Sequence, residues 1–297
     1  MPEKIIIDTD FADDIDDAIA VSFGVRWPEV DVLAITLCHY VTHERGRMLA
    51  KHLDSLGAGD IPYAPGLTRP VAAVTEEKAA DAKRRLPLQR GYVGEDERVP
   101  PPADGDAVEL MRRTIEAHPG EVTLVTIGPM TNAADLFRRY PDTPKMLKAV
   151  AMMGGDFPSE RIEYNVKSDP EAARLVFAAP TRKFLGTFEV TRRVRMLEGE
   201  IAALRASDAP SCQSLVRQID LWWPHKGGKP GPVVYDMSPV LWTARPDFFE
   251  TETRRMDVLL DGAERGRCVE SADGRPVEMS VDMRTDDALA LLMETLL

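Results

Sequence analysis

The chain has 297 residues, which is enough for one large α/β domain or for two domains of average size. Its apolar share of 44% supports a sizeable core and excludes a wholly disordered chain. Lys and Arg number 37 against 49 Asp and Glu, so the formal net charge is −12. This acid excess disfavours a nucleic acid or an anionic membrane as partner, because both need a basic surface.

The cysteines and the apolar runs indicate the cellular compartment of the protein. Cys38, Cys212 and Cys268 are scattered without CxxC spacing, which argues against a disulfide framework and a structural zinc site. No apolar run approaches the length of a membrane span, and the N-terminus reaches charged residues too soon for a secretory signal. We therefore expect a cytoplasmic protein.

Short β-branched runs alternate with longer amphipathic segments along the chain. The runs predict strands at 4–9, 30–38, 121–127, 148–153 and 183–187, with helical spacing at 16–26, 43–56, 129–139, 169–178 and 197–206. Strand-like runs at 255–260 and 277–282 and a helix from about Thr285 complete the pattern. Continuous apolar strands alternating with helices predict an α/β fold, an open and mainly parallel sheet with helices on both faces.

Two segments interrupt this alternation. Residues 84–106 and 223–235 are rich in Pro and Gly, and we predict long loops there. The sequence has no internal repeat and no low-complexity tract. We expect a single domain over residues 1–297.

Acidic residues concentrate at the end of the first predicted strand. Residues 8–17 read DTDFADDIDD, so six of ten positions are carboxylates. Ligands of an open parallel sheet sit at the carboxyl ends of its strands. Carboxylates that converge repel one another unless a cation or raised pKa values relieve the repulsion, and Ca²⁺ accepts several oxygens at once. The alternative, that these acids stabilise the N-terminus of the next helix, explains one or two of them.

Several segments resemble the inosine–uridine preferring nucleoside hydrolases. The stretch IIIDTDFADDIDDAIA resembles the N-terminal signature of that family. Further segments resemble the family in the same order: LAIT at 33–36, IPYAPGLTRPV at 61–71, VTLVTIGPMTNAADLFRRYP at 122–141, AVAMMGG at 149–155 and EYNVKSDPEAARLVF at 163–177. The resemblance implies a divergent member with a Rossmann-like fold. It also implies an N-glycosyl hydrolase that uses Ca²⁺ to split a ribonucleoside or related riboside into ribose and base.

The resemblance assigns roles to particular positions. Asp10 matches the metal ligand that also takes the proton from the attacking water, and Asp17 matches the bidentate calcium ligand. Asp16 matches a residue that binds a ribose hydroxyl. Ile127 stands where the family offers a backbone carbonyl to calcium, and Asp236 matches the late aspartate that completes the calcium shell and touches the sugar.

Glu163 and Asn165 match the pair that hydrogen-bonds the ribose, although each also suits an ordinary polar loop before a helix. Such a set fits the chemistry. Breaking a ribosyl C–N bond passes through an oxocarbenium-like state, so the sugar hydroxyls must be held and a water must be aimed at the anomeric carbon. A divalent cation and a general base together activate that water.

The sequence departs from the family at two polar positions. Tyr235 stands where a His suited to protonating the departing base is common, and tyrosine is a weaker acid. Val41 stands near the metal where an Asn is common. Trp222, Trp223 and His225 lie just upstream of Tyr235 and suit an aromatic wall that stacks the base, although helix packing explains the tryptophans equally well.

The acidic loop and the histidines leave further points open. The loop is two residues longer than the shortest form of the motif, so the roles of Asp13 and Asp14 stay open. His39 ends the second strand near the proposed site. The other histidines of the predicted helices, His43, His52 and His118, are expected on solvent-facing positions.

Three functions compete for this pattern. The first is hydrolysis of a nucleoside by a homo-oligomer, either a dimer or a tetramer, in purine or pyrimidine salvage. The second is a catalytically weakened protein that binds calcium and ribose on the same fold. The third, an Mg²⁺ phosphatase of the haloacid dehalogenase type with Asp8 as nucleophile, does not fit the downstream segments. A prenyl-synthase reading of DDIDD fails because that motif belongs on a long helix of an all-α protein.

Overall fold

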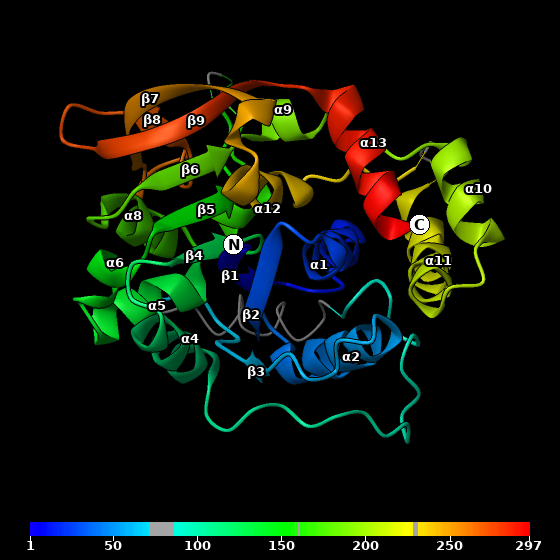
Figure 1. Ribbon diagram of the computed structural model, residues 1–297. Coiled ribbons are helices and arrows are strands. Elements are labelled where there is room, and N and C mark those ends of the chain that lie inside the picture. Colours follow the sequence, from blue (N-terminus) through cyan, green and yellow to red (C-terminus); the bar gives the residue numbers. More distant parts are fainter. Residues whose placement is uncertain (72–85, 158, 160, 228–230) are drawn as a thin grey trace.

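A computed structural model describes residues 1–71, 86–157, 159, 161–227 and 231–297 (Figure 1). Its strands are β1 (Glu3–Thr9), β2 (Val30–Leu37), β3 (Tyr63–Pro65), β4 (Val122–Thr126), β5 (Ala149–Met153), β6 (Lys183–Gly186), β7 (Phe249–Val258), β8 (Cys268–Glu270) and β9 (Arg275–Met283). Its α-helices are α1 (Asp16–Arg26), α2 (Thr42–Ser55), α4 (Ala107–Ala117), α5 (Thr131–Arg139), α6 (Thr143–Met146), α7 (Tyr164–Ser168), α8 (Pro170–Ala178), α9 (Phe188–Thr191), α10 (Glu198–Ala206), α11 (Pro210–Trp222), α12 (Met237–Ala244) and α13 (Thr285–Leu296). Two 3₁₀ helices, η1 (Trp223–Lys226) and η2 (Pro246–Phe248), complete the set.

One nine-stranded sheet runs in the order β3-β2-β1-β4-β5-β6-β9-β7-β8. The strands from β3 to β9 in this order pair in parallel, whereas β7 pairs antiparallel with both β9 and β8. The expected mainly parallel α/β sheet is therefore confirmed. The strand order reverses direction at β1 and β4, and that reversal opens a crevice at the carboxyl ends of the two strands.

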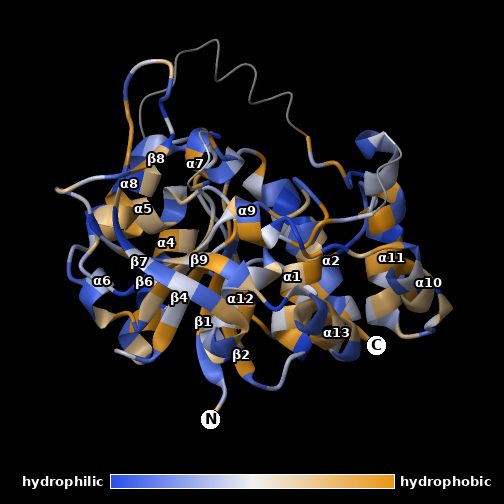
Figure 2. Cartoon of the chain, turned by 90° about the horizontal axis from the view of Figure 1, so that it is seen from above, coloured by the Kyte–Doolittle hydropathy of each residue, from blue (hydrophilic) through white to orange (hydrophobic). Residues whose placement is uncertain are grey.

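Helices cover both faces of the sheet because side chains alternate between the faces along each strand. On β1, Ile5 and Ile7 belong to one buried cluster with α1, α2, α11, α12 and α13, and Ile6 belongs to another with α4, α5 and α8. Figure 1 shows α1, α11 and α13 on one side of the sheet and α4, α5 and α8 on the other. In Figure 2 hydrophobic segments run along the strands and on α1 and α11.

Several predicted elements need adjustment. The region 84–106 was predicted as one loop, and its described part, 86–106, has no helix or strand before α4 begins at Ala107. Residues 84, 85 and 228–230 of the two predicted loops lie outside the described residues. The pattern missed the helices α4 and α11, the shorter helices α6, α7, α9 and α12, and the short strands β3 and β8. The 3₁₀ helix η1 occupies the start of the second predicted loop.

Cys38, Cys212 and Cys268 are all buried and free. None of the helices in the described part of the chain is both long and apolar enough to cross a membrane.

His52 corrects one prediction from the helical pattern. We expected it on a solvent-facing position, but it is fully buried between α1, α2 and α11. Its ring nitrogens hydrogen-bond with Ser22 Oγ at 2.8 Å and Ser214 Oγ at 2.9 Å, and Gln218 Nε2 lies 3.1 Å from Nδ1. Burial lowers the pKa of His52 to about 4, so the ring is neutral and the buried hydrogen-bond network contains no charged side chain.

Candidate active site

A cavity of about 560 Å³ opens at the carboxyl ends of the central strands. Its lining comes from the segment after β1 and the start of α1, from residues 86–88, from the end of β5, from the segments that follow β4, β5 and β6, from α7, and from residues on either side of the segment 228–230. The lining residues are Asp10, Asp13, Asp14, Asp16, Asp17, Leu86, Leu88, Ile127, Met153, Glu163, Tyr164, Asn165, Phe188, Lys226, Tyr235 and Asp236. Seven of them are carboxylates, and Lys226 is the single cation that the described chain contributes to this lining.

We call Asp16, Asp17 and Asp236 the bare cluster. Each offers an oxygen that lies within 4.8 Å of the others, and all three are buried. Asp16 and Asp17 open α1, and Asp236 occupies the N-cap position of α12. Neither helix has a side-chain hydrogen bond at its N-cap. Burial, followed by repulsion from the neighbouring carboxylates, raises the pKa of all three well above the usual range.

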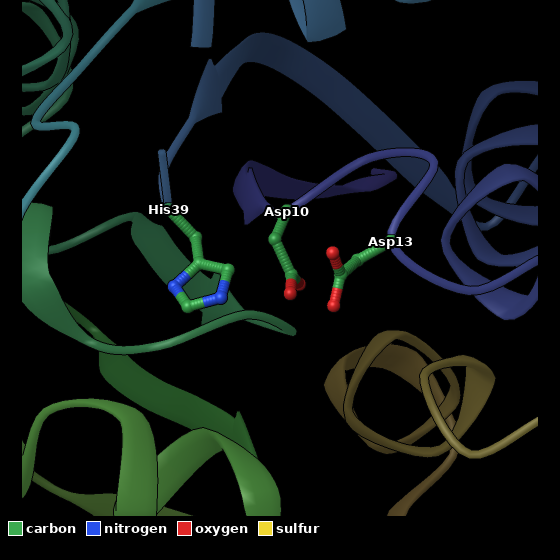
Figure 3. Close-up of side chains that lie close together, drawn as sticks. All are labelled: Asp10, Asp13 and His39. Carbon is green, nitrogen blue, oxygen red and sulfur yellow. The ribbon is translucent and has the colours of Figure 1, made fainter. Parts of the chain in front are cut away.

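We call Asp10, Asp13 and His39 the paired cluster. Their ligand atoms also lie within 4.8 Å of one another. Figure 3 shows the two carboxylates facing each other, with the ring of His39 beside Asp10. Arg45 Nη2 lies 2.9 Å from Asp13 Oδ1, and the phenol of Tyr164 donates to Asp13 Oδ2 at 2.8 Å. Burial acts to raise the pKa of Asp13, but Arg45, His39 and Tyr164 together hold it below its ordinary value.

Arg45 is fully buried and organises the strand ends beneath this cluster. Its guanidinium donates to the carbonyls of Asp10, Phe11 and His39 as well as to Asp13. The backbone that it braces is left-handed at non-glycine positions: φ is 73° at Ala12, 67° at His39 and 61° at Tyr40. Such conformations persist where surrounding contacts over-determine them and occur often in active sites.

Gly128, the residue after Ile127, has no room for a side chain. A Cβ there would lie 2.6 Å from Asp10 Oδ1 and 2.7 Å from Cys38 Sγ. Beside it, Asp8 is buried and accepts from Thr36 Oγ1 at 2.7 Å and Asn132 Nδ2 at 2.8 Å. Burial raises the pKa of Asp8 to about 7 in spite of these donors.

Glu163 and Asn165 meet at the wall next to Ile127. Asn165 Nδ2 donates to the carbonyl of Ile127 at 3.0 Å, which is the oxygen the family resemblance assigns to the metal. Glu163 caps α7 through the N–H groups of Asn165 at 2.9 Å and Val166 at 3.1 Å, and it accepts from Gly155 N–H at 3.0 Å. Burial raises the pKa of Glu163. Both side chains line the cavity and are fixed by their surroundings.

The aromatic wall differs from the one expected. Trp223 and His225 are absent from the lining, His225 is exposed, and Trp222 is buried in the core. The wall consists of Phe188 and Tyr235, whose rings stack at 5.4 Å between centroids and 17° between planes. Burial and the carboxylates of Asp16 and Asp14 raise the pKa of Tyr235.

The structure brings most of the expected site residues to one cavity. Asp10, Asp16, Asp17, Ile127, Glu163, Asn165, Tyr235 and Asp236 all line it. Val41 does not, and His39 is the residue after β2 that reaches Asp10. The sequence pattern did not predict that Leu86, Leu88, Met153, Phe188 and Lys226 line the cavity. Met153 and Phe188 had a signal, because Met153 ends β5 and Phe188 follows the end of β6 by two residues.

A family comparison now identifies the class of protein. Residues 5–286 match the model of the inosine-uridine preferring nucleoside hydrolase family, so the chain belongs to that family. Members of this class hydrolyse ribonucleosides. The family places the chain among the N-glycosyl hydrolases and agrees with a cavity whose acidic residues could hold a metal ion.

Individual relatives narrow the comparison. The chain is 29% identical over 265 residues to the pyrimidine-specific ribonucleoside hydrolase RihA of Citrobacter koseri, covering 83% of this chain and 81% of that one. Among solved structures it superposes on a plant nucleoside hydrolase with a TM-score of 0.85, at 24% identity and over 100% of this chain and 99% of that one. A purine-preferring ribonucleoside hydrolase from Gardnerella vaginalis gives a TM-score of 0.84 at 21% identity, over 99% and 98% of the two chains. These two superpositions confirm the fold.

Proposed function

We propose that the chain uses a bound Ca²⁺ to hydrolyse the N-glycosidic bond of a ribonucleoside, releasing ribose and the free base. The observation that carries the proposal is the bare cluster. Three buried carboxylates converge at the switch point of the sheet, and they neither cap their helices nor form an ion pair among the described residues. Buried like charges of this kind require a cation or protonation.

The donor set fits a hard divalent cation. Carboxylates and a backbone carbonyl are the oxygen ligands that Ca²⁺ prefers, and the proposed ligands are Asp10, Asp17, Asp236 and the carbonyl of Ile127. Burial, followed by repulsion from Asp17 and Asp13, raises the pKa of Asp10 well above its ordinary value, and a divalent cation would relieve that repulsion. When bound, Ca²⁺ supplies the positive charge that orients a ribose diol and a water molecule and makes that water more acidic.

The other roles follow from the positions of the side chains around the cavity. Asp10 accepts the proton from the water that attacks the anomeric carbon, and direct attack inverts the configuration there. Asp16 and Asp236 hold the ribose hydroxyls from one side, and Glu163 and Asn165 hold the sugar from the other. Phe188 and Tyr235 present stacked rings to a planar base.

The test is a panel of ribonucleosides assayed for free ribose, with added Ca²⁺ and after chelation. We expect at least one nucleoside to be cleaved, activity to disappear with the chelator and to return with Ca²⁺. Asp10→Asn is expected to lower kcat by about 10³-fold, because the general base is lost. Asp31→Asn is the matched control, since Asp31 is an exposed carboxylate on β2 outside the cavity.

Two results would overturn the proposal. A purified metal-free protein without affinity for added Ca²⁺ would contradict the metal. A rise in Tm with ribose or a nucleoside, without turnover of any nucleoside, would instead identify a binding protein. The oligomeric state, a dimer or tetramer, stays a prediction that light scattering can check.

A further inference from the structure

Lys226 is the one positively charged side chain on the described lining of a cavity that carries seven carboxylates. It is the last residue of η1, and its side chain is 23% exposed. Its ammonium group pairs with Asp14 Oδ2 and lies 5.6 Å from the ring centroid of Trp222. Trp222 Nε1 donates to Asp14 Oδ1, so the same carboxylate anchors both side chains. The ammonium is therefore held at the wall by fixed partners.

Asp14, in the loop between β1 and α1, supplies that anchor. Asp13 and Asp14 are adjacent carboxylates of this loop, but they bind different partners. Asp13 binds Arg45 and Tyr164, whereas Asp14 binds Trp222 and Lys226. Asp14 thus gives the loop a role that metal binding does not require, because its carboxylate is committed to a cation of the protein.

Cleavage of an N-riboside requires positive charge on the side of the base. The C–N electron pair leaves with the base, so the departing base gains negative charge that a cation or proton donor must stabilise. Tyr235 stacks on Phe188 in the aromatic wall, with 5.4 Å between the ring centroids, and a phenol carries no positive charge to the base. His225 is exposed and outside the lining, and His39 lies in the paired cluster with Asp10.

We propose that Lys226, held by Asp14, contacts the departing base and stabilises its negative charge during cleavage. The inference rests on the proposed hydrolysis and assigns its leaving-group device. It also names the substrate class, which is ribonucleosides whose base has a hydrogen-bond acceptor beside the glycosidic nitrogen, such as a ring nitrogen or a carbonyl oxygen. Lysine suits this role because its ammonium group has three N–H donors on a flexible stem.

The atoms and electrons of the step balance without a further reactant. The bond between the anomeric carbon and the base nitrogen breaks, and its electron pair stays on the base. Water gives its oxygen to the anomeric carbon and one proton to Asp10. Lys226 keeps its proton and donates a hydrogen bond to the base. The base gains its proton from solvent as it leaves, and Asp10 returns one to solvent.

The experiment compares two leaving groups in Lys226→Met. A ribonucleoside cleaved by the wild type needs help at the base, whereas the nitrophenolate of p-nitrophenyl β-ribofuranoside departs as a stable anion. We expect kcat for the nucleoside to fall by about 10²-fold and kcat for the nitrophenyl riboside to stay within about threefold. Lys51→Met is the matched control, because Lys51 makes a similar half-exposed pair with Glu97 at 2.8 Å outside the cavity.

A double variant distinguishes a contact between Lys226 and the base from simple neutralisation of the Asp14 carboxylate. If Lys226 merely neutralises Asp14, then Asp14→Asn combined with Lys226→Met restores the balance and the activity. If Lys226 acts on the base, the double variant stays as slow on the nucleoside as Lys226→Met. If the wild type does not cleave the nitrophenyl riboside, the activity of the double variant on the nucleoside tests the role of Lys226 by itself.

The outcomes that overturn the inference differ from failure of the proposed function. Equal losses on both substrates, or recovery in the double variant, contradict a role for Lys226 at the base while the hydrolase stands. A wild type that cleaves neither substrate removes the proposed hydrolysis, and this inference with it. The Tm shift caused by Ca²⁺ should be the same in the wild type and in Lys226→Met, which shows that the variant keeps the site intact.

Discussion

The bare cluster and the paired cluster lie side by side in one cavity but differ in what offsets their charge. In the paired cluster, a fully buried Arg45 and the phenol of Tyr164 satisfy Asp13, and the pKa of that carboxyl falls. In the bare cluster the hydroxyl of Thr9 donates to Asp17, but none of the three carboxylates forms an ion pair among the described residues, and their pKa values rise. Aspartate therefore forms an ion pair with a buried cation in one place and a group of mutually repelling carboxylates in the other.

Removal of one carboxylate from the bare cluster should have the largest effect. Asp17→Asn is expected to lower activity by about 10³-fold and to abolish the Tm shift caused by Ca²⁺, because a proposed ligand is lost. The same change should raise the Tm of the metal-free protein at pH 8, since it removes repulsion between buried carboxylates. Calorimetry with and without Ca²⁺ measures both effects. A metal-free variant less stable than the wild type would contradict the comparison.

Removal of Arg45 from the paired cluster should destabilise the metal-free protein, whereas removal of Asp17 from the bare cluster should stabilise it. Arg45→Met leaves Asp13 buried without its partner and frees three backbone carbonyls, so we expect a loss of about 3–5 kcal/mol in the free energy of unfolding. Urea denaturation of the metal-free protein checks this value. Asp13→Asn in the Arg45→Met background should recover part of the loss, and a double variant no more stable than Arg45→Met would refute the pairing.

The His52 network extends the comparison to a buried polar group without charge. The pKa of His52 is about 4 in the folded protein against an ordinary value of 6.5, so its contribution to stability is fully present above pH 6.5. That contribution is lost as pH falls through 4, and it amounts to about 3 kcal/mol. Urea denaturation at pH 7 and pH 4.5 should show a smaller drop for His52→Gln than for the wild type. Equal drops would show that His52 titrates normally.

The sequence predicted the sheet and the position of the site well, for a physical reason. Buried parallel strands such as β1 and β4 appear as continuous apolar runs, and the acids after β1 mark the carboxyl end of a central strand. The resemblance then supplied Glu163 and Asn165, which local pattern alone left as loop residues. Their contacts with Ile127 and Gly155 depend on tertiary packing.

Other parts of the site left no periodic signal. Lys226 follows a proline in a short 3₁₀ turn, and nothing in its neighbourhood predicts that it turns toward Asp14, more than 200 residues earlier. His52 was misplaced because helix α2 has α11 packed against it, so a polar residue on its outer side is buried. The spacing of apolar residues predicts the one face of a helix that packs in the apolar core. It does not predict a second buried face whose polar side chains are hydrogen-bonded.

The close contacts around Gly128 limit which substitutions an engineered variant of this site can carry. A library randomised at that position should return glycine alone among active clones, because even a methyl group would strike Asp10 and Cys38. A change of base preference would therefore come from substitutions at lining positions such as Leu86, Leu88 and Phe188. Gly128 limits variation next to Asp10, whereas these lining positions remain available for a change of substrate.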